Sequence, residues 1–359
     1  MGKNILVINH FGIGDVLFST PLLKAIKRRY PDASVTYVCN KRTEGLLKGN
    51  ENISNIYVFE KDDYRRKWRE SKIKCLKSIY EFINKIKHDK YDAVIDMSLG
   101  YIYSFFLWTM TSIPLRIGFN YRNRGRFLTK KLNIEGFSDK HVIEYYLELG
   151  KFLGLDADDK EMELMVSPES VVWADRYLKE HGISESDKVC AIIPGCGASW
   201  GKDAYYRRWS AWKFAELANY VADRYGYKII IFGSGSELEI CSKVEVQMSR
   251  KVIQSCGKTD LAQCAALLNR CDLVVTNDGG PLHMAVSLKK RTVSIFGPVD
   301  PRIYGPYPPG DRYIAVTSQD SCRPCYKNFK HKECKEFGCL KNIKVDDVKK
   351  AVDRLVAHK

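Results

Sequence analysis

The sequence predicts an α/β protein made of two doubly wound parallel sheets. Short apolar runs of strand length alternate with segments of helical spacing along both halves of the chain, which is the βαβ order of parallel sheets. Glycine-rich segments follow several of the apolar runs. The length of 359 residues suits two domains of this kind.

Strands and helices of the first half can be placed from the spacing of apolar residues. The segment 15–30 carries Val16, Leu17, Leu22, Leu23 and Ile26 at helical spacing. The expected strands are Ile5–Asn9, Val35–Val38, Ile56–Phe59 and Asp92–Asp96, and the expected helices are Asp15–Tyr30 and Ile73–Ile86.

A second series of strands and helices follows the polar stretch 156–161. We therefore expect domains at 1–165 and 170–344. The terminal helix, 345–359, could pack on either half, including back onto the first domain. The expected strands are Val189–Ile193, Lys228–Phe232, Leu273–Thr276 and Thr292–Phe296, and the expected helices are Trp212–Tyr225, Glu237–Arg250 and Asp260–Asn269.

The composition indicates a globular protein with anionic partners. Lys and Arg number 58 against 43 Asp and Glu, a formal charge of +15, which suits nucleotides, nucleic acid or a membrane surface. The sequence begins without a signal peptide, so we expect a cytoplasmic protein with reduced cysteines. The longest apolar run, 101–110, is too short to span a bilayer and predicts a buried or interfacial helix.

Every glycine-rich segment comes directly after a predicted strand. Because parallel strands place their carboxyl ends at one edge of a sheet, and ligands bind there, these segments are the candidate binding loops. They are Gly12–Gly14, Pro194–Gly197, Gly233–Gly235 and Gly279–Gly280.

The segment Asn277–His283 predicts a phosphate site. Gly279 and Gly280 allow close approach of a ligand to the backbone, and Pro281 fits the first turn of a helix. The free amides of that turn favour an anion, with Asp278 and His283 on either side. The alternative is a strand-to-helix turn with ordinary caps.

Basic residues follow the glycine-rich loop at Gly195. Arg207 or Arg208 could bind a diphosphate through two hydrogen bonds, and Lys202 could act as a point charge. Glu237, which follows the next glycine-rich turn, could bind ribose hydroxyls or simply cap a helix. Asp15 likewise could cap a helix or accept a proton from a hydroxyl.

Two further groups of residues suggest surface or metal roles. Cys322, Cys325, Cys334 and Cys339 lie in one short basic segment; four thiols suit structural zinc or iron, and the alternative is reduced cysteines or a redox pair. Two basic runs occupy the first half, one from Arg65 to Lys77 and one from Arg116 to Lys131. They indicate either a solvated surface or contact with an anionic acceptor or membrane, with Arg122, Arg124 and Arg126 as candidate acceptor ligands.

Taken in order, these motifs resemble glycosyltransferase family 9, the bacterial heptosyltransferases. The resemblance covers nearly the whole chain. The matching residues are Gly12, Gly14, Asp15, Thr20 and Pro21 in the first motif; Pro194, Gly195, Arg207 and Trp209 in the central loop; Asp278, Gly280, Pro281 and His283 in the Asp-x-Gly-Pro-x-His signature; and Phe296–Pro298 with Pro301 after it.

The resemblance implies a GT-B fold of two Rossmann-like domains and inverting transfer of heptose from ADP-heptose, with the lipopolysaccharide inner core as the expected acceptor. It implies that Asp15 is the general base and that the second domain binds the donor. No cofactor is implied for the chemistry, although some members carry a cysteine cluster and a few of these bind iron. An enzyme working on such an acceptor would lie on the inner face of the cytoplasmic membrane.

Some residues depart from the family pattern, and other functions remain as alternatives. The family often has Thr where this chain has Gly279, and Cys196, Gly197 and Ala198 replace hydroxyl residues of some members. The alternatives are a transferase or epimerase using another sugar nucleotide, a transferase with a protein acceptor, and a non-catalytic protein that binds nucleotides or nucleic acid.

Overall fold

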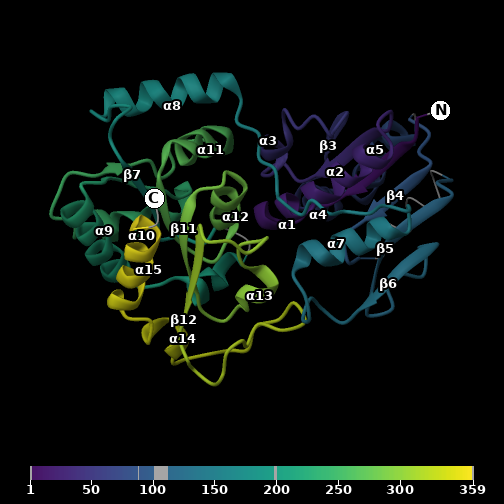
Figure 1. Ribbon diagram of the computed structural model, residues 1–359. Coiled ribbons are helices and arrows are strands. Elements are labelled where there is room, and N and C mark those ends of the chain that lie inside the picture. The colour runs from purple at the N-terminus through teal and green to yellow at the C-terminus, as the bar shows by residue number, and fades with distance from the viewer. Residues whose placement is uncertain (1, 88, 101–111, 198–199, 358–359) are drawn as a thin grey trace. The chain divides into compact units, whose positions relative to one another are not determined.

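The chain folds into two compact units, Met1–Glu161 and Met162–Lys359 (Figure 1). This computed structural model describes residues 2–87, 89–100, 112–197 and 200–357. Each unit is built on one six-stranded sheet in which every strand pair is parallel. The predicted fold class, two doubly wound α/β units, is confirmed.

In unit 1 the strand order is β3-β2-β1-β4-β5-β6, so the order reverses between β1 and β4. At such a reversal the loops leaving the two central strands diverge and create a binding site. The strands are β1 (Asn4–Ile8), β2 (Ser34–Cys39), β3 (Asn55–Val58), β4 (Ala93–Asp96), β5 (Leu115–Tyr121) and β6 (Lys130–Ile134).

The helix predicted over Asp15–Tyr30 is wrong in one respect, because the structure has two helices there. Helix α1 ends at Phe18, and α2 begins at Thr20 with Pro21 in its first turn, where a missing N–H is tolerated. The helices of unit 1 are α1 (Ile13–Phe18), α2 (Thr20–Arg29), α3 (Glu44–Leu47), α4 (Lys61–Glu70), α5 (Lys72–Lys87) and α7 (Val142–Lys151). The helix predicted at 101–110 lies outside the described residues.

Unit 2 repeats the same topology, with strand order β12-β11-β10-β7-β8-β9 and a reversal between β7 and β10. Strands β7, β8, β10 and β11 are almost wholly buried, as expected for a sheet covered on both faces, whereas the edge strand β12 is half-buried throughout. They are β7 (Val189–Ile193), β8 (Lys228–Ile231), β9 (Ile253–Gln254), β10 (Leu273–Asn277), β11 (Arg291–Phe296) and β12 (Tyr313–Thr317).

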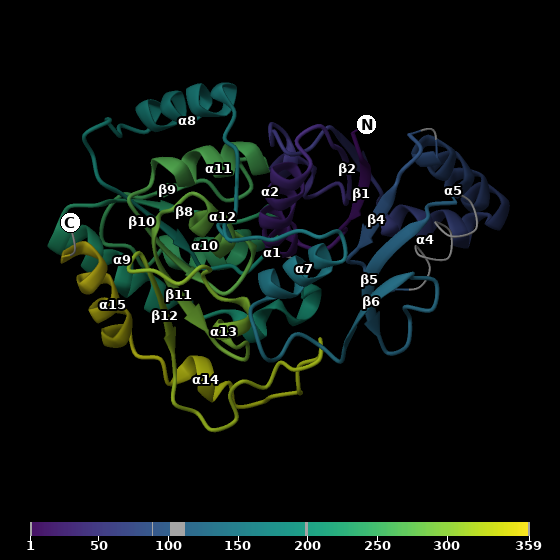
Figure 2. The ribbon, with the colours of Figure 1, turned by 45° about the vertical axis from the view of Figure 1, so that its right-hand side comes forward.

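The C-terminal helix α15 (Val345–Ala357) packs on unit 2, against α9 (Ala211–Tyr225), β11 and β12 (Figure 2). Its apolar face, with Val348, Val352 and Leu355, is buried in the core of unit 2. The helix predicted over Glu237–Arg250 ends earlier, at Glu245. The helices of unit 2 are α8 (Pro168–Glu180), η1 (Gly201–Arg207), α9 (Ala211–Tyr225), η2 (Gly235–Glu237), α10 (Leu238–Glu245), α11 (Leu261–Arg270), α12 (Gly280–Ser287), α13 (Pro301–Tyr304), α14 (Gly338–Lys341) and α15 (Val345–Ala357). None of the helices that the structure describes is long and apolar enough to cross a bilayer.

Candidate functional site

The glycine-rich loop at Gly195 and the signature loop at Asp278 lie side by side at the topological reversal of unit 2. They follow β7 and β10, which are paired in the sheet. Asn277, the last residue of β10, is fully buried, and its Nδ2 donates to the carbonyl oxygens of Pro194 (2.8 Å) and Gly195 (3.2 Å). Its Oδ1 accepts from the backbone N–H of Trp209 at 3.0 Å. The sequence analysis missed this role of Asn277; an amide side chain ending a buried apolar strand was the available signal.

Two glycines of the site are required by close packing. A Cβ at Gly279 would overlap the carbonyl group of Cys196, and a Cβ at Gly195 would overlap the carboxylate of Glu237. The backbone of Gly279 is extended, so the constraint comes from neighbouring atoms and not from φ. The loop geometry in this chain is therefore built around glycine at both positions.

Glu237, at the end of η2 (Gly235–Glu237), holds the glycine-rich loop at Gly195 in place. Its buried carboxylate accepts from the backbone N–H groups of Cys196 and Gly197, both at 2.9 Å, and from the N–H and hydroxyl of Ser234 at 3.0 and 2.8 Å. Burial raises the pKa of Glu237, but these hydrogen bonds outweigh it, and the net pKa lies below its usual value. The charged carboxylate is thus a fixed part of the loop, which supports the capping interpretation.

Arg207 and Asp278 form a buried ion pair, with 2.9 Å between Nη2 and Oδ2. Burial lowers the pKa of Arg207, whereas the negative charge of Asp278 raises it. The upward effects are larger, so the pKa of Arg207 lies above its usual value. Burial raises the pKa of Asp278, and Arg207 opposes that effect. The Arg207 guanidinium also lies 5.0 Å from the centre of the Trp200 ring. In this structure Arg207 therefore links η1 to the signature loop.

Two other basic residues flank this pair. Lys202 is exposed on η1. Arg208 is partly buried, 3.7 Å from Glu237 Oε1, and its Nε is buried with no hydrogen-bond partner among the described residues. A buried donor without a partner is unfavourable, and an anionic ligand would satisfy it.

The signature loop leads into α12. Gly279 is the N-cap of this helix, and Gly280 and Pro281 form its first turn. His283 is buried within α12, and its carbonyl oxygen accepts from Ser287 Oγ at 2.8 Å. The N-terminus of α12 thus begins beside the glycine-rich loop, and helix N-termini favour anions.

Asp15 lies in unit 1, in the first turn of α1, at the loop that leaves β1. The side chain is partly exposed. Oδ2 accepts from the N–H of Gly12 at 3.3 Å, and Asn9 Nδ2 holds the Asp15 carbonyl at 2.9 Å. The residue therefore caps the helix and is partly exposed.

Arg122, Arg124 and Arg126 gather in the exposed turn between β5 and β6 of unit 1. The first two lie over the Tyr121 ring at 4.9 and 6.0 Å, and Arg126 lies over Phe127 at 4.7 Å. Aromatic rings thus hold three guanidinium groups in one turn, which makes a cationic surface.

The four C-terminal cysteines lie close enough for their thiols to interact electrostatically with one another. No group of three or more His, Cys, Asp or Glu among the described residues is placed to hold a metal ion. Cys322 is exposed, whereas Cys339 is packed in the core of unit 2, where burial raises the pKa of its thiol to about 11. Arg323 holds this segment by donating to the carbonyl oxygens of Gly297 (2.5 Å) and Ser318 (3.0 Å), and a metal site at the four cysteines stays a prediction.

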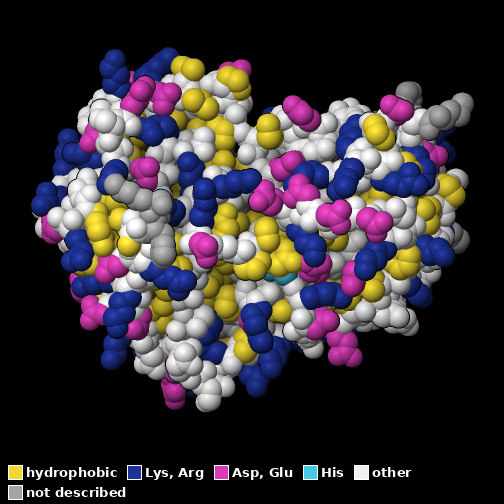
Figure 3. Space-filling model, viewed as in Figure 1, with side chains coloured by type: hydrophobic (Ala, Val, Ile, Leu, Met, Phe, Trp, Pro, Cys, Tyr) yellow, Lys and Arg dark blue, Asp and Glu magenta, His cyan; other side chains and the backbone are white. Residues whose placement is uncertain are grey.

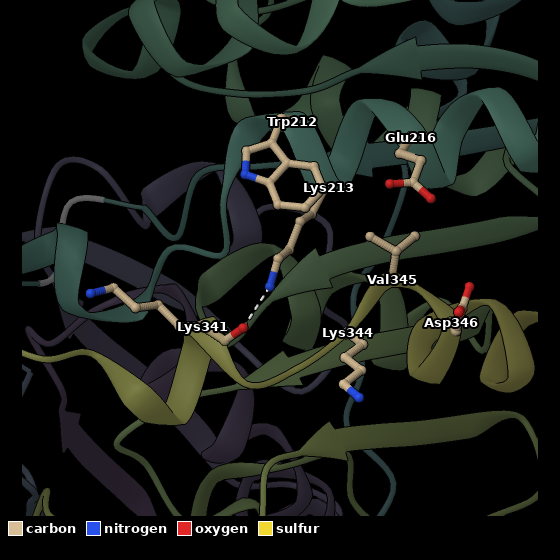
Figure 4. A pocket seen from close by; sticks show the side chains of 7 residues that line it. All are labelled: Trp212, Lys213, Glu216, Lys341, Lys344, Val345 and Asp346. Atoms are coloured by element: carbon tan, nitrogen blue, oxygen red, sulfur yellow. Dashed lines mark hydrogen bonds between the residues drawn. The ribbon is translucent and has the colours of Figure 1, made fainter.

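A separate pocket of about 530 Å³ lies between α9 and the α14–α15 segment (Figure 4). Lys213 Nζ donates there to the carbonyl oxygens of Lys341 and Ile343, both at 2.7 Å. None of the residues predicted for the functional site lines this pocket, so it is distinct from the loops at Gly195 and Asp278.

Two doubly wound units in one chain are the GT-B architecture of glycosyltransferases, and comparison with known proteins identifies the family. Residues 79–336 match the model of glycosyltransferase family 9 (heptosyltransferase). The chain belongs to this family and is a glycosyltransferase.

Solved structures and curated relatives match along nearly the whole chain. A family 9 glycosyltransferase from Veillonella parvula has a TM-score of 0.83 and 27% identity, covering 99% of this chain and 98% of that one. The E. coli ADP-heptose LPS heptosyltransferase II has a TM-score of 0.75 and 20% identity, covering 99% of each chain. The lipopolysaccharide core heptosyltransferase OpsX of Haemophilus influenzae is 24% identical, covering 89% of this chain and 86% of its own length.

Proposed function

We propose that this glycosyltransferase moves a heptosyl group from ADP-heptose to the inner core of lipopolysaccharide, with inversion at the anomeric carbon. The names of its relatives support the donor and acceptor classes. The observation that best supports the proposal is that the loops at Gly195 and Asp278 are bonded to each other at the topological reversal of unit 2. Asn277 and Glu237 hold these loops at the edge of the sheet where a nucleotide binds.

The donor diphosphate is proposed to bind at the N-terminus of α12. Gly279 and Gly280 leave the backbone open there, and the first-turn amides attract the phosphates. Arg208, whose Nε is buried without a partner among the described residues, and the exposed Lys202 supply cations. The Arg207–Asp278 pair and Glu237 act as positioning residues, and His283 borders the site.

Asp15 is proposed to be the general base. It takes the proton of the acceptor hydroxyl while that oxygen bonds to the anomeric carbon of the donor. The bond from this carbon to the diphosphate oxygen breaks, and ADP leaves with the electron pair. A positioned base of this kind contributes about 10²–10⁴-fold to rate. Arg122, Arg124 and Arg126 are proposed to bind anionic groups of the acceptor.

The proposed chemistry uses the chain's own cations. Negative charge develops on the leaving diphosphate as its bond breaks. Arg208, Lys202 and the α12 amides therefore stabilise the transition state more strongly than the ground state. Such a site needs no divalent ion to neutralise the leaving group. Because the acceptor is a glycolipid, we place the enzyme on the inner face of the cytoplasmic membrane.

The decisive experiment is incubation of the protein with ADP-heptose and a panel of truncated lipopolysaccharide cores, followed by mass spectrometry. We expect a heptose mass increment on one core structure and no increment with UDP-sugars. Transfer from a UDP-sugar alone would contradict the donor assignment. An increment on a protein, with none on any core, would contradict the acceptor assignment.

A further inference from the structure

The helical hairpin α4–α5 of unit 1 exposes a stripe of large apolar side chains. Ile73, Leu76 and Tyr80 of α5 are 80%, 50% and 56% exposed, and Trp68 of α4 is 48% exposed. Positions 73, 76 and 80 are three and four residues apart, so they lie on one side of the helix. Three of these four side chains therefore share one side of α5 and are not scattered single exposures.

This stripe borders the buried side of α5, because Leu76 and the buried Ile83 are seven residues apart and point in nearly the same direction. Cys75, Ile83 and Ile86 are buried, and Ile86 and Phe82 contact the core formed around β1 and β4. Helices α4 and α5 lie side by side (Figure 2). The buried side of α5 therefore packs within unit 1, and the apolar stripe beside it is left exposed.

Basic residues are abundant on the two helices that carry the stripe. Residues 61–87 contain ten Lys and Arg against four Asp and Glu, an excess of six positive charges. Lys72, Lys77 and Lys87 of α5 are exposed and carry no ion pair to any described residue, and Lys72 Nζ lies 5.8 Å from the Trp68 ring. Figure 3 shows Lys and Arg side chains mixed with Asp, Glu and hydrophobic ones over the visible face of unit 1.

We infer that the α4–α5 hairpin is a membrane-docking surface that inserts Trp68, Ile73, Leu76 and Tyr80 among the lipids of an anionic bilayer. An exposed helix face with Trp, Leu and aromatic residues beside Lys and Arg is the pattern of an interfacial helix. The lysines attract the negative leaflet, and the apolar side chains gain stabilisation by leaving water. The inference builds on the proposed function, because it places the enzyme beside a membrane-borne acceptor.

The test is co-sedimentation of the full-length protein with vesicles of phosphatidylcholine, with and without phosphatidylglycerol. We expect binding only when phosphatidylglycerol is present. The variant Ile73→Ser/Leu76→Ser/Tyr80→Ser should bind at least about tenfold more weakly. These side chains are exposed, so we expect the variant to fold. The matched control is Val172→Ser/Val246→Ser on unit 2, at side chains that are 59% and 78% exposed, and it should bind like the wild type.

Charge is tested separately. Lys72→Gln/Lys77→Gln/Lys87→Gln should weaken binding about tenfold or more, whereas Lys179→Gln/Lys251→Gln/Lys350→Gln, at exposed positions of unit 2, should not. Quenching of tryptophan emission by brominated lipids should fall in Trp68→Phe if that ring inserts.

Several results would overturn the inference. These are failure of the wild type to bind phosphatidylglycerol vesicles, binding of an RNA oligonucleotide in their place, and unchanged binding by the triple serine variant. Transfer to a soluble core oligosaccharide without lipid chains is measured in parallel. A serine variant that loses vesicle binding but keeps this transfer supports docking. If the wild type transfers no heptose at all, the proposed function is contradicted, whereas the conclusion about vesicle binding is unaffected.

Discussion

Arg207 and Asp278 form a buried ion pair across two segments of unit 2, with 2.9 Å between guanidinium and carboxylate. Removing one partner leaves a buried charge without compensation. We expect Arg207→Ala to lower the free energy of unfolding by about 3–5 kcal/mol, and Arg207→Met/Asp278→Leu to recover much of the loss. Urea denaturation measures both.

An exposed pair on the same unit provides the control. Arg250 lies 2.6 Å from Asp223, with both side chains more than half exposed, and Arg250→Ala should cost at most about 1 kcal/mol. Equal losses for Arg207→Ala and Arg250→Ala would show that the buried pair does not hold the signature loop.

The carboxylate of Glu237 makes stability depend on pH. Its pKa in the folded chain is lowered, because hydrogen bonds to the carboxylate outweigh the effect of burial. Its contribution is therefore fully present above its ordinary pKa of 4.5 and is lost as the pH falls through the folded value. We expect Glu237→Gln to cost about 1–3 kcal/mol at neutral pH and less at pH values below the folded pKa. Parallel loss at both pH values in urea titrations would contradict this assignment.

Much of unit 2's candidate site follows from the sequence. Glycine-rich segments after buried apolar runs must lie at one edge of a parallel sheet, and the loops at Gly195 and Gly279 do so. What the sequence lacks is the direction of each side chain. The sequence predicts that Arg207 binds the diphosphate, but it does not reveal that Arg207 also pairs with Asp278.

Other differences have equally local causes. The break between α1 and α2 depends on Pro21 opening a new first turn. The spacing of the four C-terminal cysteines suits a metal, and that assignment stays a prediction; what the sequence does not reveal is that Cys339 is buried in the core of unit 2. Strands β5 and β6 contain Arg and Lys and have no continuous apolar run. The spacing of apolar residues therefore does not predict these two strands.

The cysteine segment makes a prediction that separates packing from metal ligation. We expect Cys322→Ser, at an exposed position, to change stability by less than about 0.5 kcal/mol. Cys339→Ser, in the core, should cost about 1–3 kcal/mol. Thermal denaturation of both variants and metal analysis of the purified wild type check this. Similar large losses in both variants, together with bound zinc or iron, would show that the four thiols form a metal site.

Chelation tests whether the chain's own cations suffice for transfer. Because Arg208, Lys202 and the α12 amides are proposed to stabilise the leaving diphosphate, we expect EDTA to leave the transfer rate unchanged. The rate is followed by ADP release from ADP-heptose in the presence of a core acceptor. Prompt loss of rate that magnesium restores would assign leaving-group stabilisation to a divalent ion.

Asp15→Asn tests the proposed base most directly. The asparagine Oδ1 can still accept from the Gly12 N–H, so the cap is kept and stability should change by less than about 1 kcal/mol. The amide cannot take a proton, and turnover should fall about 10²–10⁴-fold. ADP affinity, measured by calorimetry, should stay unchanged, because the residues proposed to bind the donor lie in unit 2. Asp159→Asn, at an exposed carboxylate of the same unit, is the matched control and should remain active. Wild-type turnover by Asp15→Asn would remove this residue from its proposed role, since no other change in that variant restores a proton acceptor at the position.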